Sequence, residues 1–180
     1  MTSPRSRALD AAIDLLGTKG LRALTHVRVD DRAGIPRGST SNYFRTRAAL
    51  LAGVAGRIIE REMPAAATAL APTSVDEVVD SISALVVSTT TVQRTLTTAR
   101  LVLFMEASHD PTLRDALAAG RQALEGEVVS VLARLGSPDP ATGAAAVMAC
   151  AEGLILHRIA RGDETDPRRA LELVTRAALA

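Results

Sequence analysis

The sequence predicts an all-α protein of about nine helices, and three observations lead to this prediction. Hydrophobic residues make up 47% of the 180 residues, whereas aromatic residues make up only 2% and tryptophan is absent. Alanine and leucine dominate and favour helices, whereas a sheet or barrel is typically built from β-branched and aromatic residues. Apolar residues also recur at helical spacing along nearly the whole chain, and the alternation typical of strands never persists.

The first predicted helix lies close to the N-terminus. Leu9, Ile13 and Leu16 fall at helical spacing and form an apolar stripe. Gly17 with Gly20 is expected to end this helix, because glycine adopts the left-handed conformation found at many helix C-termini without strain.

Two shorter helices follow, with a glycine-containing turn between them. Thr25 can cap the second helix, which is expected to reach about Ala33, and Gly34 supplies its stop. Pro36 suits the first turn of the third helix, where its missing N–H group would have no partner in any case. Three short helices with a tight turn between the second and the third match the helix-turn-helix plan.

Longer helices account for the rest of the chain, and turn residues mark their ends. Thr46 can cap a fourth helix that Pro64 is expected to terminate, and the Ala-, Pro- and Thr-rich residues 64–73 are the best candidate domain boundary. Ser74 and Glu77 have the spacing of a capping box. The helices expected after this point include residues 78–87, 92–108, 112–135 and 141–161, and a last helix starts at Pro167.

The composition favours a cytoplasmic protein. The single cysteine, Cys150, excludes an internal disulfide and fits a reducing compartment. Because Cys150 lies in an apolar run, a buried inert thiol is favoured over a nucleophile. The N-terminal residues lack the apolar core of a secretion signal. The longest apolar window, residues 144–156, is too short to span a bilayer and contains Glu152, so no membrane partner is expected.

Charge is distributed unevenly along the chain, although the net charge is only +1. Residues 1–60 carry ten lysines and arginines against five acidic residues, whereas residues 61–180 carry eleven against fifteen. A basic head on an acidic body is expected when one end of a protein meets a polyanion.

The third helix of a helix-turn-helix lies in the major groove of DNA, and the residues predicted here suit that task. Asn42 is the strongest candidate for base reading, because an amide can form two hydrogen bonds to adenine. Gly38 lets the backbone come close to a phosphate. Thr25, Thr46 and Arg47 stand at helix N-termini, where an anion is favoured. The full set of predicted DNA contacts is Thr25, Arg28, Arg37, Gly38, Ser39, Thr40, Ser41, Asn42, Tyr43, Thr46 and Arg47.

Tyr43 and Phe44 are two of the three aromatic residues in the chain. Adjacent residues of a helix point about 100° apart, so the two rings are expected to have different roles. Phe44 is placed to turn inward against the first and fourth helices. Tyr43 is placed to face outward and offer its hydroxyl group to a phosphate oxygen.

The stretch from Gly20 to Leu51 resembles the DNA-binding head of the TetR/AcrR-type bacterial transcriptional regulators. Asp30 stands where that family usually has Ala, and Ser41 stands where it usually has Tyr, which places more of the phosphate contact on Tyr43. The positions that match the family are Gly20-Leu21, Thr25, Ala33-Gly34-Ile35, Gly38, Tyr43-Phe44, Arg47 and Leu50.

The resemblance also implies how the chain is organised. Residues 1–47 would form the DNA-binding domain, and residues 48–180 would form a helical domain for effector binding and dimerisation. Such regulators are homodimers, and the interface is expected from helices near residues 112–135 and 141–161, where many small residues allow close approach. The body would hold a small-molecule pocket whose occupancy changes the separation of the two heads. Candidate lining residues are Leu85, Val86, Leu101, Phe104, Met105, His109, Met148 and Glu152, although residues of these types are more often plain core than ligand contacts.

With these observations, the resemblance implies a ligand-responsive regulator that represses by binding a palindromic operator as a homodimer and is released by an unidentified small molecule. An enzyme is not expected, because His26, His109 and His157 show neither metal nor triad spacing. No cofactor motif is recognised and no metal site is expected. The alternative is a helical protein–protein adaptor without DNA binding. An adaptor should ignore DNA at every salt concentration, whereas a repressor should bind it with a steep negative salt slope.

Overall fold

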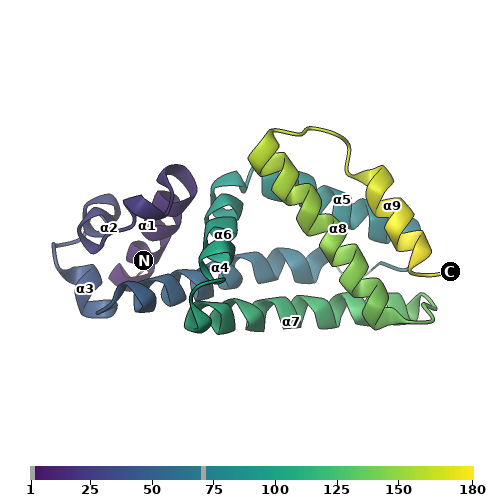
Figure 1. Cartoon of the computed structure of the whole chain (residues 1–180), viewed down its shortest axis with the longest axis horizontal. Helices are drawn as coiled ribbons and strands as arrows, with labels where there is room; N and C mark the ends of the chain where they lie inside the picture. The colour runs from purple at the N-terminus through teal and green to yellow at the C-terminus, as the bar shows by residue number, and fades with distance from the viewer. Residues whose placement is uncertain (1–2, 70–71) are drawn as a thin grey trace. The chain divides into compact units, whose positions relative to one another are not determined.

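The computed structural model describes residues 3–69 and 72–180, and these residues form helices joined by turns (Figure 1). The predicted all-α class and number of helices are confirmed, since the described residues contain nine α-helices, one short 3-10 helix and no strand. The elements are α1 (Pro4–Lys19), η1 (Leu21–Ala23), α2 (His26–Ala33), α3 (Ser39–Tyr43), α4 (Arg47–Ala69), α5 (Val75–Thr90), α6 (Arg94–Glu106), α7 (Pro111–Arg134), α8 (Pro140–Arg161) and α9 (Arg168–Ala177).

The chain divides into two compact units. The first comprises Met1–Glu62 and Arg94–Gly120, and the second comprises Met63–Gln93 and Arg121–Ala180. The first unit therefore contains α1, α2, α3 and α6 as whole helices, and the second contains α5, α8 and α9.

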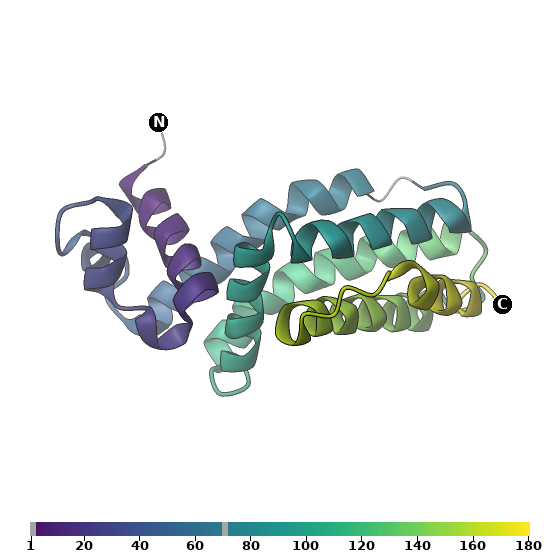
Figure 2. The same cartoon turned by 90° about the horizontal axis from the view of Figure 1, so that it is seen from above.

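The first unit is organised around α1, whose apolar face supplies much of its core. α2, α3 and α6 all contact α1, and α6 lies next to the C-terminal end of α1 (Figure 2). Leu16, Val29, Leu50 and Leu103 come from four different helices, and none of them is more than 1% exposed. The predicted apolar stripe of the first helix is confirmed, because it forms the centre of this core.

Gly17 has a different role from the predicted one. Helix α1 continues to Lys19, and Gly20 ends it with a backbone φ of 74°. Gly17 instead lies inside α1, where α6 comes so close that a Cβ atom would lie 2.1 Å from the Thr95 carbonyl oxygen. A side chain at this position would require the two helices to separate.

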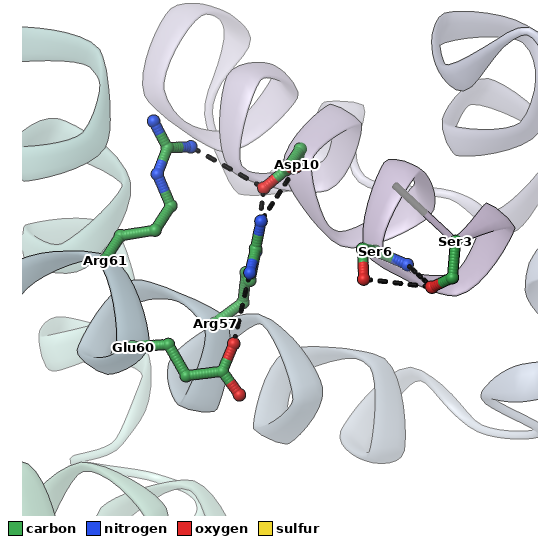
Figure 3. A network of polar contacts seen from close by, with 6 residues as sticks. All are labelled: Ser3, Ser6, Asp10, Arg57, Glu60 and Arg61. Carbon is green, nitrogen blue, oxygen red and sulfur yellow. Dashed lines mark hydrogen bonds and ion pairs between the residues drawn. The ribbon is translucent and has the colours of Figure 1, made fainter. Parts of the chain in front are cut away.

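Ion pairs join the helices of the first unit. Figure 3 shows Asp10 of α1 facing Arg57 and Arg61 of α4, at 2.9 and 3.6 Å. Glu62 of α4 pairs with Arg100 of α6 at 3.2 Å. Burial raises the pKa of the Glu62 carboxyl group above its usual value, and the Arg100 guanidinium offsets only part of this effect.

In the second unit, α5, α8 and α9 pack against one another. Val79 and Val86 of α5 meet Ile155 of α8 and Leu171 of α9 in one apolar cluster. A second cluster joins α7 to α8 through Val128, Leu132, Ala144 and Met148. Two largely exposed ion pairs, Arg168–Asp80 and Arg176–Asp76, link α9 to α5 and contribute at most about 1 kcal/mol each.

Several predicted helix caps are confirmed. The Ser74 hydroxyl accepts the Glu77 N–H at 3.2 Å, and the Glu77 carboxylate in turn accepts the Thr73 N–H at 2.7 Å. The Thr46 hydroxyl accepts the Ala49 N–H at 3.1 Å at the start of α4. These contacts satisfy amide groups that have no partner within a helix. The Glu77 carboxylate binds the amide of Thr73, one residue before the Ser74 cap, whereas a capping box places this bond at the cap residue itself.

The predicted end of the fourth helix is wrong. Helix α4 continues through Pro64 to Ala69, so the loop expected over residues 64–73 is shorter, and residues 70–71 of it lie outside the described residues. A proline inside a helix costs about 3 kcal/mol. The three alanines that follow Pro64 have the highest helix propensity and offset part of this cost.

Helix α8 is longer than the apolar window predicted from the sequence. Its length and a mean hydropathy of 1.3 would allow it to cross a membrane, but core helices of water-soluble proteins pass the same test. Only 28% of its apolar window is buried within the structure, so much of this surface has no partner in the described residues. Cys150 of α8 is half-buried, where the sequence predicts a buried thiol, and this partial burial raises the pKa of its thiol.

Candidate nucleic-acid interface

The candidate interface is built from α2, α3 and the turn between them. The Thr25 hydroxyl accepts the Arg28 N–H at 3.3 Å and caps α2 as predicted. Gly34 ends α2 at the predicted place with a left-handed φ of 62°. The prediction that Pro36 lies in the first turn of the third helix is wrong. Pro36 lies in the turn before α3, where its carbonyl oxygen accepts the Ser39 N–H at 3.1 Å.

The N-terminus of α3 is capped by a carboxylate from α2. Gly38 occupies the cap position with a φ of 89° and has no side chain to offer. Asp30, which is only 1% exposed, accepts the N–H groups of Gly38 at 2.7 Å and Thr40 at 2.8 Å, and the Thr40 hydroxyl at 2.5 Å. Burial raises the pKa of Asp30, but the Thr40 and Gly38 donors outweigh burial, so its pKa lies below the usual value. Asp30 is therefore an ionised buried group with its hydrogen bonds satisfied.

The C-terminus of α3 is also held by α2. The Nε2 atom of His26 lies 2.7 Å from the Phe44 carbonyl oxygen, so this nitrogen carries the proton and donates. Phe44 is 4% exposed, and its ring lies so close to Gly53 of α4 that a Cβ there would be 2.6 Å away. Tyr43 is 44% exposed. The predicted inward and outward orientations of the two rings are confirmed.

Nine of the eleven residues predicted to contact DNA are exposed, whereas Ser39 is half-buried and Thr40 is buried. Thr40 is fully buried and donates its hydroxyl to Asp30, and the Ser39 hydroxyl donates to the Pro36 carbonyl oxygen at 2.6 Å. Thr40 thus supports the turn from inside, where the sequence predicts an outward-facing contact. The exposed group is Thr25, Arg28, Arg37, Gly38, Ser41, Asn42, Tyr43, Thr46 and Arg47.

Two arginines of the basic head bind carbonyl groups of the head itself. Arg47 donates to Leu24 at 2.8 Å and to Leu21 at 3.0 Å. At the C-terminal end of α2, Arg7 donates to the carbonyl oxygens of Ala33 at 2.7 Å and Gly34 at 2.8 Å. These partners stand 23 to 27 residues away in sequence, so no local pattern could have predicted them. Part of the basic excess therefore stabilises the fold of the head.

Two arginines outside the predicted set border the exposed group. The Arg5 guanidinium lies 5.3 Å from the centroid of the Phe44 ring, which brings the start of α1 next to α3. Arg45 is exposed between α3 and α4. Arg45 stands directly between the recognition helix and Thr46, a predicted phosphate contact, and this position could have added Arg45 to the predicted DNA contacts.

The residues predicted to line an effector pocket are distributed over both units. Phe104 and Met105 of α6 belong to the first unit and are 49% and 72% exposed. Val86 and Met148 belong to two different apolar clusters of the second unit. Glu152 forms an ion pair with Arg121 at 2.6 Å. Leu85 and Leu101 are half-buried, and His109 is exposed.

A surface groove of about 340 Å³ lies between the start of α8 and α9 in the second unit. None of the predicted pocket residues lines it. Its lining residues are Pro138, Asp139, Thr142, Gly143, Ala146, Leu173, Val174, Ala177 and Ala178. Within the described residues, no group of three or more His, Cys, Asp or Glu side chains could hold a metal ion.

Two family profiles match the chain. Residues 8–54 match the bacterial regulatory proteins of the tetR family, and residues 73–180 match the tetracycline repressor-like C-terminal domain. No curated protein sequence matches the chain.

Solved structures resemble the chain over nearly its whole length. A transcriptional regulator from Rhodococcus sp. RHA1 has a TM-score of 0.87 at 20% identity, with 99% of this chain and 96% of that chain covered. A TetR transcription regulator from Haloarcula marismortui has a TM-score of 0.84 at 15% identity, with 98% of each chain covered. The multidrug binding protein EbrR complexed with ethidium has a TM-score of 0.78 at 25% identity, with 99% and 100% covered.

Proposed function

The chain belongs to the tetR family of bacterial regulatory proteins, and from this premise we propose that it is a repressor that binds a palindromic operator as a homodimer. The family membership makes it a transcriptional regulator with a DNA-binding domain, and proteins of this family are generally not enzymes. The observation that carries the proposal is the exposed surface of α3, where Ser41, Asn42 and Tyr43 all face solvent.

The exposed residues suggest how the head would divide its contacts. Asn42 would read a base edge in the major groove, because its amide both donates and accepts. Arg37 and Ser41 would reach neighbouring base edges, and Tyr43 and Thr46 would contact phosphates. In this proposal residues 1–47 bind DNA and residues 48–180 bind the effector and the second subunit. Arg28, Gly38, Thr25 and Arg47 complete the proposed contact surface.

The homodimer is supported by the exposed face of α8, which comprises Ala145, Ala149 and Leu156. These residues fall at helical spacing on one side of the helix, and Leu156 is 47% exposed. Leu173 of α9 is 73% exposed and is a further apolar side chain without cover in the same unit. The exposed residues in the second half of α7 are partly polar and partly small, namely Gln122, Ala123, Gly126, Glu127, Ser130, Ala133 and Arg134. Because Leu156 makes the exposed face of α8 the more apolar of the two, we propose α8 as the centre of the interface, with α9 and residues 112–135 at its sides.

A small-molecule effector is supported by a similar protein. EbrR is a multidrug binding protein with a solved ethidium complex, and it is 25% identical to this chain. Effector binding would shift the equilibrium between two head separations, by no more than its difference in affinity for the two states. The predicted pocket residues remain the candidates, and the presence of only three aromatic residues disfavours a large planar effector.

Selection from random duplex DNA, followed by sequencing of the retained fragments, tests the proposal. An inverted repeat is expected, with half-sites that place the two recognition helices about 34–36 Å apart. Affinity for the selected sequence should fall steeply as salt rises, because counterions are released when arginines bind phosphates. Failure to enrich any sequence at low salt without effector would contradict the proposal and favour the adaptor alternative.

A further inference from the structure

Two side chains of α2 reach opposite ends of α3. His26 and Asp30 are four residues apart, so they lie on the same face of α2. Asp30 binds the first turn of α3 through Gly38 and Thr40, and His26 binds the carbonyl group of Phe44 just after the last turn. The recognition helix is thus held at both ends by one neighbour.

A helix as short as α3 needs such support. It has five residues, and forming the first turn of any helix costs conformational entropy, because several backbone dihedral angles are fixed for a single hydrogen bond. Gly38 at the cap position offers no side-chain acceptor of its own. At the start of α3 the external partner also matches the helix dipole, because the Asp30 carboxylate stands at the positive end.

The same two anchors enclose the residues proposed to read bases. Ser41 and Asn42 stand between Thr40, which is bound by Asp30, and Phe44, which is bound by His26. Recognition side chains must be held within about 0.5 Å and 10–20° of their productive geometry. Release of either anchor would let α3 tilt or fray and would spread these two side chains over several orientations.

We propose that His26 and Asp30 form a two-ended clamp that determines the sequence specificity of this protein by fixing the orientation of α3. The inference rests on the proposed function, because it concerns how the same surface discriminates between DNA sequences. Neither residue touches bases in this scheme, so both are positioning residues. Asp30 also occupies the amides at the start of α3, which keeps them from holding a DNA phosphate and leaves this helix for base reading.

Asp30→Asn and Asp31→Asn form a matched pair of variants. Both remove one negative charge from α2, so both should raise non-specific DNA affinity to a similar extent. Asp31 is exposed and lies 3.5 Å from Arg37, and of the two aspartates Asp30 is the one that accepts hydrogen bonds from Gly38 and Thr40 at the start of α3. The asparagine amide nitrogen cannot accept a hydrogen bond, so Asp30→Asn leaves Gly38 or Thr40 without its partner.

His26→Ala and His26→Gln test the other end of the clamp. The alanine variant loses the donor to Phe44. The glutamine amide can donate to the same carbonyl oxygen and should restore most of what alanine loses. Thr40→Val and Thr40→Ser serve as a second pair in case Asp30→Asn does not fold, because only the serine keeps the hydroxyl donor.

The measurement is the ratio of dissociation constants for a scrambled duplex and for the duplex selected by the wild type, taken well below the melting temperature of each variant. We expect the ratio to fall about tenfold for Asp30→Asn and for His26→Ala, and to stay near the wild-type value for Asp31→Asn and His26→Gln. An unchanged ratio in folded Asp30→Asn, with only a lower melting temperature, would overturn the inference and leave the clamp a stabilising contact. An equal fall in Asp31→Asn would also overturn it, because charge would then be the cause. Failure of the wild type to bind any duplex would instead refute the proposed function itself.

Discussion

Helix α3 and helix α8 obtain their stability in opposite ways. α3 has five residues, and side chains of another helix bind amide groups at its start and the Phe44 carbonyl group just after its end. α8 has 22 residues, its own Asp139 cap and a glycine C-cap, yet most of its apolar window is not buried. The first helix depends on its neighbours for its shape. The second has caps of its own, packs part of its apolar surface against α5, α7 and α9, and leaves the rest exposed.

The difference indicates what each helix contributes to function. A helix fixed from outside presents its few exposed side chains in one orientation, which suits discrimination between similar ligands. A long helix with small exposed residues allows another helix to approach closely, which suits association. Substitutions should therefore affect specificity around α3 and assembly around α8.

The largest effect is expected from Ala149→Glu on the exposed face of α8. A carboxylate without a partner in a helix–helix interface should prevent dimerisation and weaken operator binding roughly 100-fold, about 3 kcal/mol. Sedimentation velocity would measure the mass, and titration of the selected duplex would measure affinity. Val92→Glu is the control, because Val92 is 89% exposed in the turn after α5 and outside the proposed interface. A dimer that persists in Ala149→Glu would exclude α8 as the centre of the interface.

Asn42→Ala should have the next largest effect. The loss of a bidentate contact to a base should cost about 1–3 kcal/mol on the selected duplex while non-specific binding stays nearly intact. Binding to the selected and scrambled duplexes, measured at one salt concentration, separates the two contributions. Equal losses on both sequences would mean that Asn42 contacts the backbone and that α3 reads bases with other side chains.

Arg47→Ala should weaken binding to all sequences alike and should also lower stability. The variant loses a positive charge near the proposed phosphate contacts and two hydrogen bonds to the Leu21 and Leu24 carbonyl groups, together worth about 1–3 kcal/mol. Thermal unfolding distinguishes the two roles. Arg45→Ala removes the same charge two residues earlier and should reduce DNA affinity with little change in melting temperature. Equal melting temperatures for the two variants would contradict the structural role of Arg47.

The smallest effects concern two carboxyl groups of the first unit, the buried Asp30 and the half-buried Glu62. The pKa of Asp30 is lowered in the folded protein, so its contribution to stability is present above its unfolded pKa of about 3.9 and is lost as pH falls through the folded value. The pKa of Glu62 is raised, so stability falls as pH rises from about 4.3 through the folded value.

Urea unfolding across this pH range would measure both contributions. The stability difference between wild type and Asp30→Asn should grow as pH rises from strongly acidic values. The difference between wild type and Glu62→Gln should shrink or change sign over the pH interval above 4.3. Parallel pH profiles for the two variants would show that burial alone, and not the donors around Asp30, decides the sign.

Local sequence signals predicted the frame of both regions. Thr25 and Gly34 bound α2, and Pro140 to Arg161 form a helix close to the predicted range, because caps, glycines and periodicity act within a few residues. The orientation of Phe44 and Tyr43 followed from the angle between adjacent helical residues. The helix bounds and the two ring orientations could be predicted without knowing which residues pack against them.

The polar interior of the turn could not be predicted in the same way. Thr40 has the composition of a base-reading residue, and it is buried because Asp30, ten residues earlier, accepts its hydroxyl. The partner of Arg47 is likewise a carbonyl group 23 residues away. Such contacts depend on how distant segments pack against each other. A single sequence indicates this packing only through its pattern of apolar residues. The helix through Pro64 was missed because a local rule about proline gave way to the strong propensity of the alanines that follow it.

The contact between Gly17 and Thr95 limits which sequences this protein can reach by mutation. Even a methyl group at position 17 would collide with a carbonyl oxygen of the backbone, which cannot rotate away as a side chain could. At Gly126 in α7, the space around the added carbon is open, and alanine there should stabilise the helix by about 1 kcal/mol. In a saturation library selected for folded protein, codon 17 should retain glycine while codon 126 drifts towards alanine. The crossing of α1 and α6 would then keep glycine at position 17 during evolution, while the sequences of the surface helices diverge.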